Sequence, residues 1–232
     1  MIVGRGLIAG AFSRYEHDTN VVIFASGVSN SRESDPTAFQ REKDLLMPYL
    51  GRKELLVYFS SCSLFDPSLK NSPYITHKKE LELLISERAA SYLIVRLPIV
   101  VGRSDNPNTL INFLYHQILE KKRFQLYSRA CRYLMDIDDA ARWVSHIIDN
   151  NLLRNQVINM CIGETVPIRD VVMSLEKITG KPAEYDEVNK GECYRVDCDV
   201  FNRLTQTEGA VYPEDYFDRV LRKYLATERV RT

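Results

Sequence analysis

The sequence of 232 residues predicts an α/β fold, in which helices flank a parallel β-sheet and a small annex follows at the C-terminal end. Short continuous apolar runs such as Val21–Ala25 (VVIFA) are typical of strands buried on both faces. These runs alternate with helical segments, which favours a parallel sheet with right-handed crossovers. The alternation stops after about residue 162, where amphipathic helices surround a polar stretch, and this change predicts the annex.

The core is expected over residues 1–162. Its strands are predicted at Met1–Gly4, Val21–Ala25, Leu55–Ser60, Tyr92–Leu97 and Val157–Cys161. Its helices are predicted over Leu7–Tyr15, from Asp35-Pro36 to Leu50 and from Ser72-Pro73 to Ala90. Asp or Ser followed directly by Pro is a helix-start signal, because Pro is favoured at the first helical position.

The annex is expected over residues 163–232, packed on the core and not folding independently. An amphipathic helix over Ile168–Thr179 ends at Gly180, a residue type that commonly terminates helices. A second helix is predicted over Pro213–Leu225, and the polar stretch Glu184–Asp199 lies between the two.

Composition excludes several classes of protein. The 31 Lys and Arg balance 31 Asp and Glu, so the electrostatic footprint of a dedicated nucleic-acid binder is missing. No stretch approaches the roughly 20 apolar residues of a membrane span, and the N-terminal segment lacks signal-peptide features. The five cysteines form no C-x-x-C pair (Cys62, Cys131, Cys161, Cys193 and Cys198). We therefore expect free thiols, no structural zinc and a cytoplasmic location.

A glycine-rich turn, Gly4-Arg5-Gly6-Leu7-Ile8-Ala9-Gly10, follows the first strand and opens a helix. Dinucleotide sites need glycines there, because the turn is tight and the backbone must approach a pyrophosphate at a helix N-terminus. On the motif alone, a plain strand-to-helix turn remains the alternative. The acidic ribose ligand expected about 20 residues further on is missing, since Asp18 precedes a strand instead of ending one.

A serine, a tyrosine and a lysine form the second constellation. Ser60-Ser61 ends a strand, and ligands of open parallel sheets bind at such strand ends. Tyr74 and Lys78 lie one helical turn apart, and a nearby ammonium makes a phenol a usable general acid or base. The alternative is an exposed Tyr–Lys pair without a role, as we assign to Tyr49 and Lys53.

In order along the chain, these segments resemble the extended short-chain dehydrogenase/reductases, in particular the NAD-dependent epimerase/dehydratase family that acts on nucleotide sugars. The matching segments are Gly4–Ala9, Phe24–Gly27, Ser60–Phe65, Pro73-Tyr74 with Lys78, Arg96–Gly102, Arg132–Ala141 and Asn159–Gly163. Their order and coverage are more specific than any single motif. The resemblance implies a Rossmann-like sheet that binds NAD or NADP.

The resemblance also implies site residues. Tyr74 would be the general acid/base, Lys78 would hold the nicotinamide ribose and Ser61 would orient the sugar oxygen. Cofactor contacts would come from Gly4, Arg5, Gly6, Leu7, Ile8, Ala25, Ser26, Gly27, Tyr74, Lys78 and Pro98. Substrate contacts would come from Ser61, Asn108 and Arg132. The Arg132 guanidinium suits a diphosphate, but a surface arginine without a binding role is an equally good interpretation.

The chain is shorter than the family pattern between the glycine turn and Val21. Two strand–helix units normally lie there, and one such unit takes about 30 residues, so we infer that the second and third Rossmann strands are deleted. Met1–Val3 should then form a sheet edge, and the adenosine half of the cofactor should lose contacts. Arg5 leaves NAD and NADP as alternatives, because its cation could contact either pyrophosphate or a 2′-phosphate.

Two functions follow from these features. The first is a nicotinamide-dependent epimerase or reductase of a nucleotide sugar in polysaccharide biosynthesis; a dehydratase is disfavoured because no acidic pair adjoins Ser61. The alternative is a degenerate protein that binds a nucleotide sugar without redox turnover. A homodimer is expected through the helices Asp35–Leu50 and Tyr74–Ala90, using Leu81, Leu84 and Ile85, unless that face packs on the sheet.

Overall fold

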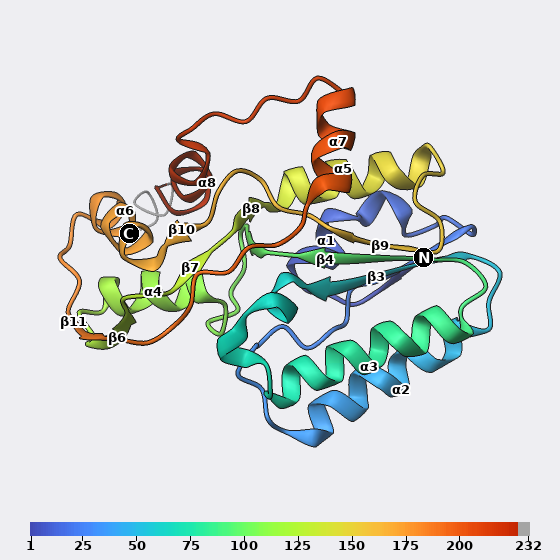
Figure 1. Ribbon diagram of the computed structural model, residues 1–232, viewed down its shortest axis with the longest axis horizontal. Coiled ribbons are helices and arrows are strands. Elements are labelled where there is room, and N and C mark those ends of the chain that lie inside the picture. Colours follow the sequence, from blue (N-terminus) through green and yellow to red (C-terminus); the bar gives the residue numbers. More distant parts are fainter. Residues whose placement is uncertain (227–232) are drawn as a thin grey trace.

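The computed structural model describes residues 1–226 and contains one five-stranded parallel sheet (Figure 1). Its strands, in spatial order, are β1 (Ile2–Val3), β2 (Val21–Phe24), β3 (Leu55–Ser61), β4 (Tyr92–Leu97) and β9 (Gln156–Asn159). All four neighbouring pairs are parallel, and Ser61 of β3 lies opposite Leu97 of β4. The predicted α/β fold and the five core strands are confirmed.

Helices cover both faces of the sheet (Figure 1). One face carries α2 (Pro36–Leu50) and α3 (Pro73–Arg88), and the other carries α1 (Leu7–Ala11) and α5 (Ile137–Asp149). Because successive side chains of a strand point to opposite faces, Tyr58 packs with the first pair of helices and Val57 with the second. Each face therefore has its own buried apolar cluster.

The two helices that carry residues of the candidate site, α2 and α3, start where the sequence predicts. The Asp35 carboxylate accepts a hydrogen bond from the Thr37 backbone N–H, and the Ser72 hydroxyl accepts one from Ile75 N–H. In both helices Pro occupies the first helical position, where a missing N–H costs nothing. These caps fix where α3 begins, and with it the position of Tyr74.

The C-terminal part of the described chain packs around a third apolar cluster, which includes Ile118, Val171 and Leu221. The helices around this cluster are α4 (Leu110–Leu119), α6 (Ile168–Thr179) and α8 (Tyr216–Leu225), whereas α7 (Asp199–Thr207) packs against β9 and the core cluster that contains Trp143. The short strands of the C-terminal part pair as β5 (Ile99–Val101) with β8 (Leu134–Asp136), β6 (Phe124–Tyr127) with β11 (Tyr185–Val188), and β7 (Cys131–Arg132) with β10 (Val166–Pro167). Residues 227–232, the last of the predicted annex, lie outside the described residues.

Several predicted boundaries were wrong. The first helix ends at Ala11 and is followed by a separate 3-10 turn over Ser13–Tyr15. The last core strand ends at Asn159, and the final helix starts at Tyr216 instead of Pro213. The polar stretch after Glu184 contains the strand β11 and leads into α7. β11 has no apolar alternation of its own and is stabilised by pairing with β6.

The expectation that all cysteines are free was wrong for two of them. Cys131 and Cys193 form a disulfide that links β7 to the segment after β11. They are 62 residues apart, so their proximity depends on the tertiary fold. Cys62, Cys161 and Cys198 are free and buried, and Cys62 Sγ lies 3.9 Å from Cys161 Sγ.

None of the helices within residues 1–226 is both long enough and apolar enough to span a membrane. Within the same residues, no group of three or more His, Cys, Asp or Glu side chains is arranged to hold a metal ion.

Candidate functional site

The predicted serine and tyrosine lie on neighbouring elements at the carboxyl end of the sheet. Ser61 is the last residue of β3 and Tyr74 is the second residue of α3, which packs beside that strand. The Ser61 hydroxyl accepts a hydrogen bond from Ser63 N–H and caps a 3-10 turn over Cys62–Phe65. Tyr74 is only 4% exposed, so the alternative of a solvated Tyr–Lys pair is excluded.

Lys78 is engaged by a carboxylate that the sequence did not bring to attention. Its Nζ lies 2.9 Å from Glu42 Oε1 and 3.1 Å from the Tyr58 hydroxyl, and the side chain is 2% exposed. Nζ also lies 5.8 Å from the centre of the Tyr74 ring, and no hydrogen bond joins these two side chains in the described structure. The ammonium therefore neighbours the phenol but is committed to Glu42.

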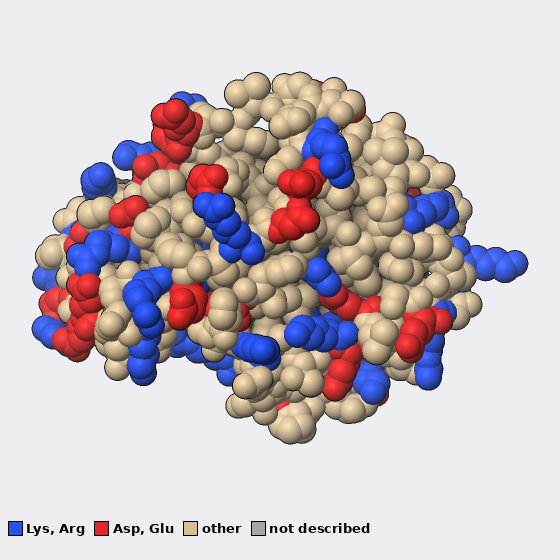
Figure 2. Space-filling view, in the orientation of Figure 1, with Lys and Arg blue, Asp and Glu red and all other residues tan. Residues whose placement is uncertain are grey.

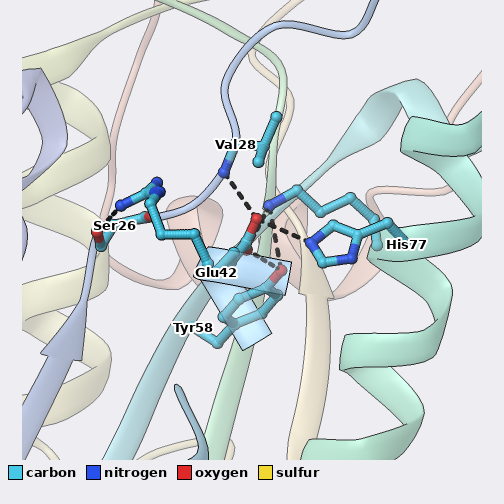
Figure 3. Close-up of polar contacts among 7 residues, drawn as sticks. Ser26, Val28, Glu42, Tyr58 and His77 are labelled. Atoms are coloured by element: carbon cyan, nitrogen blue, oxygen red, sulfur yellow. Dashed lines mark hydrogen bonds and ion pairs between the residues drawn. The ribbon is translucent and has the colours of Figure 1, made fainter. Parts of the chain in front are cut away.

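Glu42, on α2, accepts hydrogen bonds from several elements at once (Figure 3). Tyr58 OH donates to Oε1 over 2.8 Å, Val28 N–H donates to Oε2 over 2.7 Å, and His77 Nε2 lies 3.0 Å from Oε2. The Glu42 side chain is 0% exposed. With Lys78 as the fourth partner, the carboxylate joins α2, β3, α3 and the loop after β2.

The pKa of Glu42 reflects these partners. Burial by itself disfavours the charged carboxylate, but the Lys78 charge and the hydrogen bonds from His77, Val28 and Lys78 outweigh it and lower the pKa from 4.5 to about 2. Burial, together with the Glu42 charge, raises the pKa of Tyr58 well above 10. Tyr58 is therefore a fixed hydrogen-bond donor and Glu42 a fixed anion at neutral pH.

The loop after β2 lies directly over this buried group. A Cβ built on Gly27 would lie 2.9 Å from Lys78 Nζ and 3.0 Å from Glu42 Oε1, so only glycine fits without displacing them. Arg41 donates to Ser26 Oγ and to the Ser26 carbonyl, which ties the loop to α2. The loop residues expected to contact a cofactor thus form the cover over Lys78.

In the glycine turn, the Gly4 backbone lies close to the backbone at the end of β2. Gly4 has φ +135°, and a Cβ there would lie 2.4 Å from the Ala25 carbonyl oxygen, so this position requires glycine. Gly6 is exposed with no atom within 4 Å of a built Cβ, so the backbone beside it is open. Arg5 is exposed, whereas Leu7 and Ile8 are half-buried and pack on the apolar clusters.

These observations test the fit of a nicotinamide dinucleotide. The open backbone at Gly6, beside the turn at Arg5, suits the pyrophosphate half. The nicotinamide half would have to lie beside Tyr74 and Lys78, where two of the three donors of the ammonium already point to Glu42 and Tyr58. The residues therefore fit a nicotinamide dinucleotide if the third N–H donor of the Lys78 ammonium binds it.

Arg132, expected to meet the substrate diphosphate, is also paired. Its guanidinium lies 2.7 Å from Asp66 Oδ2, an ion pair without hydrogen-bond geometry, and donates to the carbonyls of Cys131 and Glu192. It also stacks over the Tyr194 ring at 5.4 Å. Its side chain is 19% exposed, so a ligand has access to its edge, and the alternative of an unconstrained surface arginine is excluded.

The remaining predicted residues lie in connecting segments. Asn108 is exposed, and its backbone N–H donates to Asn106 Oδ1. Asn106 also donates to Ser29 Oγ over 3.3 Å, so this loop contacts the loop after β2. Pro98 is half-buried between β4 and β5. The structure brings Tyr74, Lys78 and Gly27 together, and places Asn108 on a separate loop.

Neither a protein-family profile nor a curated protein matches the chain, but solved structures do. The chain is similar to a UDP-glucuronic acid 4-epimerase from Bacillus cereus in complex with UDP-glucuronic acid and NAD (21% identity, 95% of this chain, 81% of that chain, TM-score 0.66). It is also similar to a Bacillus anthracis dTDP-glucose 4,6-dehydratase in complex with NAD (14%, 96%, 78%, 0.68). A third similar structure is a dTDP-4-dehydrorhamnose reductase from Clostridium acetobutylicum (14%, 94%, 84%, 0.66).

These similarities establish the class of fold. It is the Rossmann-like α/β fold of nucleotide-sugar epimerases, dehydratases and reductases. Three different reactions are represented among the similar structures, so the fold by itself does not choose one of them.

Proposed function

We propose that the protein is a nicotinamide-dependent oxidoreductase or epimerase that acts on a nucleotide sugar. The observation that carries this proposal is the placement of Tyr74 and Lys78 at the start of α3, beside the strand that ends at Ser61. The same fold binds NAD in similar epimerase and dehydratase structures. NAD and NADP remain alternative cofactors for this chain.

In this proposal each side chain has a separate role in the reaction at the sugar carbon. Tyr74 exchanges a proton with the sugar oxygen, and the Ser61 hydroxyl orients that oxygen. Lys78 and the glycine turn, with the backbone at Ala25, Ser26, Gly27 and Pro98, hold the cofactor. A nicotinamide held there would supply the hydride transfer. Arg132 and Asn108 contact the nucleotide end of the substrate.

The absence of an acidic neighbour favours epimerisation or reduction over dehydration. Ser61 is flanked by Ser60, Cys62 and Ser63, none of which can deliver the second proton transfer of a dehydration. Ser60 Oγ is buried and has no hydrogen-bond partner in the described structure.

A second candidate is a protein that binds a nucleotide sugar without redox turnover. It is favoured by the Glu42–Lys78 ion pair and by the sheet edge. β1 has two residues and pairs only with β2 within residues 1–226, so no further strand of the described chain supports an adenosine. This arrangement supports our proposal that the second and third Rossmann strands are deleted and that dinucleotide affinity is reduced.

We also propose an assembly, a cellular location and a pathway for the protein. The apolar residues expected in a dimer contact pack on the sheet instead: Leu81 and Ile85 are 1% and 0% exposed, and Leu84 packs beside them. A homodimer through α2 and α3 would therefore use outer residues such as Leu45 and Leu83, which are 38% and 58% exposed. We retain a cytoplasmic enzyme of polysaccharide biosynthesis as the proposed context.

The charge on one face of the molecule does not mark a nucleic-acid interface there. On the face shown in Figure 2, basic and acidic side chains are interspersed, without a continuous basic stripe. A non-specific phosphate-backbone binder requires such a stripe.

The test is hydride transfer between a nicotinamide cofactor and a panel of UDP- and dTDP-sugars. We expect the Tyr74→Phe variant to lose about 10²- to 10⁴-fold in turnover, the usual contribution of a general acid/base. Tyr49→Phe, at the other Tyr-x-x-x-Lys copy, is the matched control and should retain activity. Equal turnover of Tyr74→Phe and wild type would contradict the proposal.

A further inference from the structure

Glu42 is a residue that none of the sequence motifs singles out. It is a fully buried anion whose four partners come from three segments, the loop after β2, β3 and α3, and one partner is the lysine assigned to the cofactor. A buried ammonium without a counter-charge is strongly destabilised, and Glu42 supplies that counter-charge to Lys78 at 2.9 Å.

The geometry also decides what can reach Lys78. Gly27 lies against both ends of the ion pair, and Val28 N–H is bonded to the carboxylate, so the loop after β2 covers the ammonium. Tyr58 lies 3.1 Å from Nζ on another side. Since Lys78 has three donors and two are taken by Glu42 and Tyr58, a ribose hydroxyl can bind only the third donor and must share the positive charge with Glu42.

We propose that Glu42 is a positioning residue that anchors the Lys78 ammonium under the loop after β2 and competes with a dinucleotide ribose for it. The identity of the ligand in this inference rests on the proposed function. The anchoring of Lys78 by Glu42 is independent of the proposed function. Glu42 thereby sets the dinucleotide affinity of the site without touching the ligand.

The first experiment measures the hold on Lys78 without any ligand. Trace acetylation of the whole protein with acetic anhydride, read by mass spectrometry, compares Lys78 with its exposed neighbour Lys79. We expect Lys78 to react at least 10-fold more slowly than Lys79 in the wild type. Glu42→Gln should raise the Lys78 rate at least 10-fold, whereas Glu80→Gln, which removes an exposed carboxylate from the same helix, should not.

The second experiment measures dinucleotide binding by calorimetry in a double-mutant cycle. We expect Glu42→Gln to bind NADH or NADPH several-fold more tightly than the wild type, and this gain to vanish in a Lys78→Met background. A gain that persists without Lys78, or an affinity unchanged by Glu42→Gln, would overturn the proposal. If Glu42→Gln does not fold, Glu42→Asp, which withdraws the carboxylate by one methylene, should show smaller changes of both kinds.

The two readouts separate this inference from the proposed function. If no variant binds a dinucleotide while Lys78 is protected in the wild type and released in Glu42→Gln, the proposed cofactor is wrong and the anchoring role stands. If Lys78 reacts as fast as Lys79 in the wild type, the anchoring role is wrong, whatever the binding result.

Discussion

Two ion pairs at the carboxyl end of the sheet each engage a cation that was expected to serve a ligand. Glu42–Lys78 lies wholly within the core, with side chains 0% and 2% exposed. Asp66–Arg132 joins the segment after β3 to β7 of the C-terminal part, and Arg132 is 19% exposed. A buried cation is fixed by its counter-ion, whereas a cation at the rim can exchange one anion for another. The two pairs should therefore respond differently to the loss of their carboxylates.

The largest difference is expected in stability. Glu42→Ala leaves the Lys78 ammonium buried and unpaired, and breaking a buried pair in this way typically costs about 3–5 kcal/mol. Asp66→Ala should cost about 1–2 kcal/mol, because Arg132 keeps two backbone carbonyls and partial hydration. Urea unfolding of both variants measures the comparison, and equal losses would remove the distinction between the pairs.

The double variant Glu42→Leu with Lys78→Met is the control for that experiment. Replacing both partners of a buried pair by apolar side chains is often neutral. We expect it to recover most of the stability lost in Glu42→Ala; no recovery would mean that the other partners of Glu42 carry the effect.

Acid sensitivity sharpens the same comparison. The pKa of Glu42 is lowered in the folded state, so its contribution to stability is fully present above about pH 4.5 and is lost as pH falls toward 2. A shift from 4.5 to about 2 corresponds to about 3 kcal/mol. Between these pH values the double variant should lose less stability than the wild type, as measured by unfolding at a series of pH values. Parallel curves would contradict the assigned pKa.

A smaller effect is expected on ligand affinity at the rim. Asp66→Asn keeps the oxygen that accepts from Ser68 but removes the charge that faces Arg132. The guanidinium is then free for a diphosphate, so UDP or a UDP-sugar should bind several-fold more tightly in calorimetry. Arg132→Met should weaken the same binding. Unchanged affinity in both variants would show that Arg132 is purely structural.

The smallest effect concerns assembly. Leu83→Lys places a charge on the exposed face of α3 without touching the sheet-facing residues. If α2 and α3 form a dimer contact, sedimentation should show a shift toward monomer with unchanged unfolding. A wild type that is monomeric at micromolar concentration would remove the dimer from the account.

The sequence predicted the sheet and the helix starts well because those signals are local. VVIFA and LLVYFS are buried strands with the period and composition that such strands require, and Asp35 and Ser72 are caps that act within three residues. The β6–β11 pair was missed because a strand of the type YDEV is stabilised by its neighbour and not by its own pattern.

The partners of the site could not be predicted for the same reason. Glu42 and Lys78 are 36 residues apart and belong to different helices, so no spacing rule connects them. Within its own helix Glu42 reads as one of several charged residues, and nothing distinguishes it from an exposed one. The Cys131–Cys193 disulfide and the Asp66–Arg132 ion pair likewise depend on how distant segments are brought together by the fold.

The most direct test of the central claim is calorimetric titration of NADH and NADPH into the purified wild-type protein and its Lys78→Met variant. We predict saturable binding of one of the two dinucleotides to the wild type, weakened at least 10-fold in Lys78→Met and unchanged in Glu80→Gln. Nucleotide-sugar binding with no heat from either dinucleotide would contradict it and leave a binding protein without redox turnover.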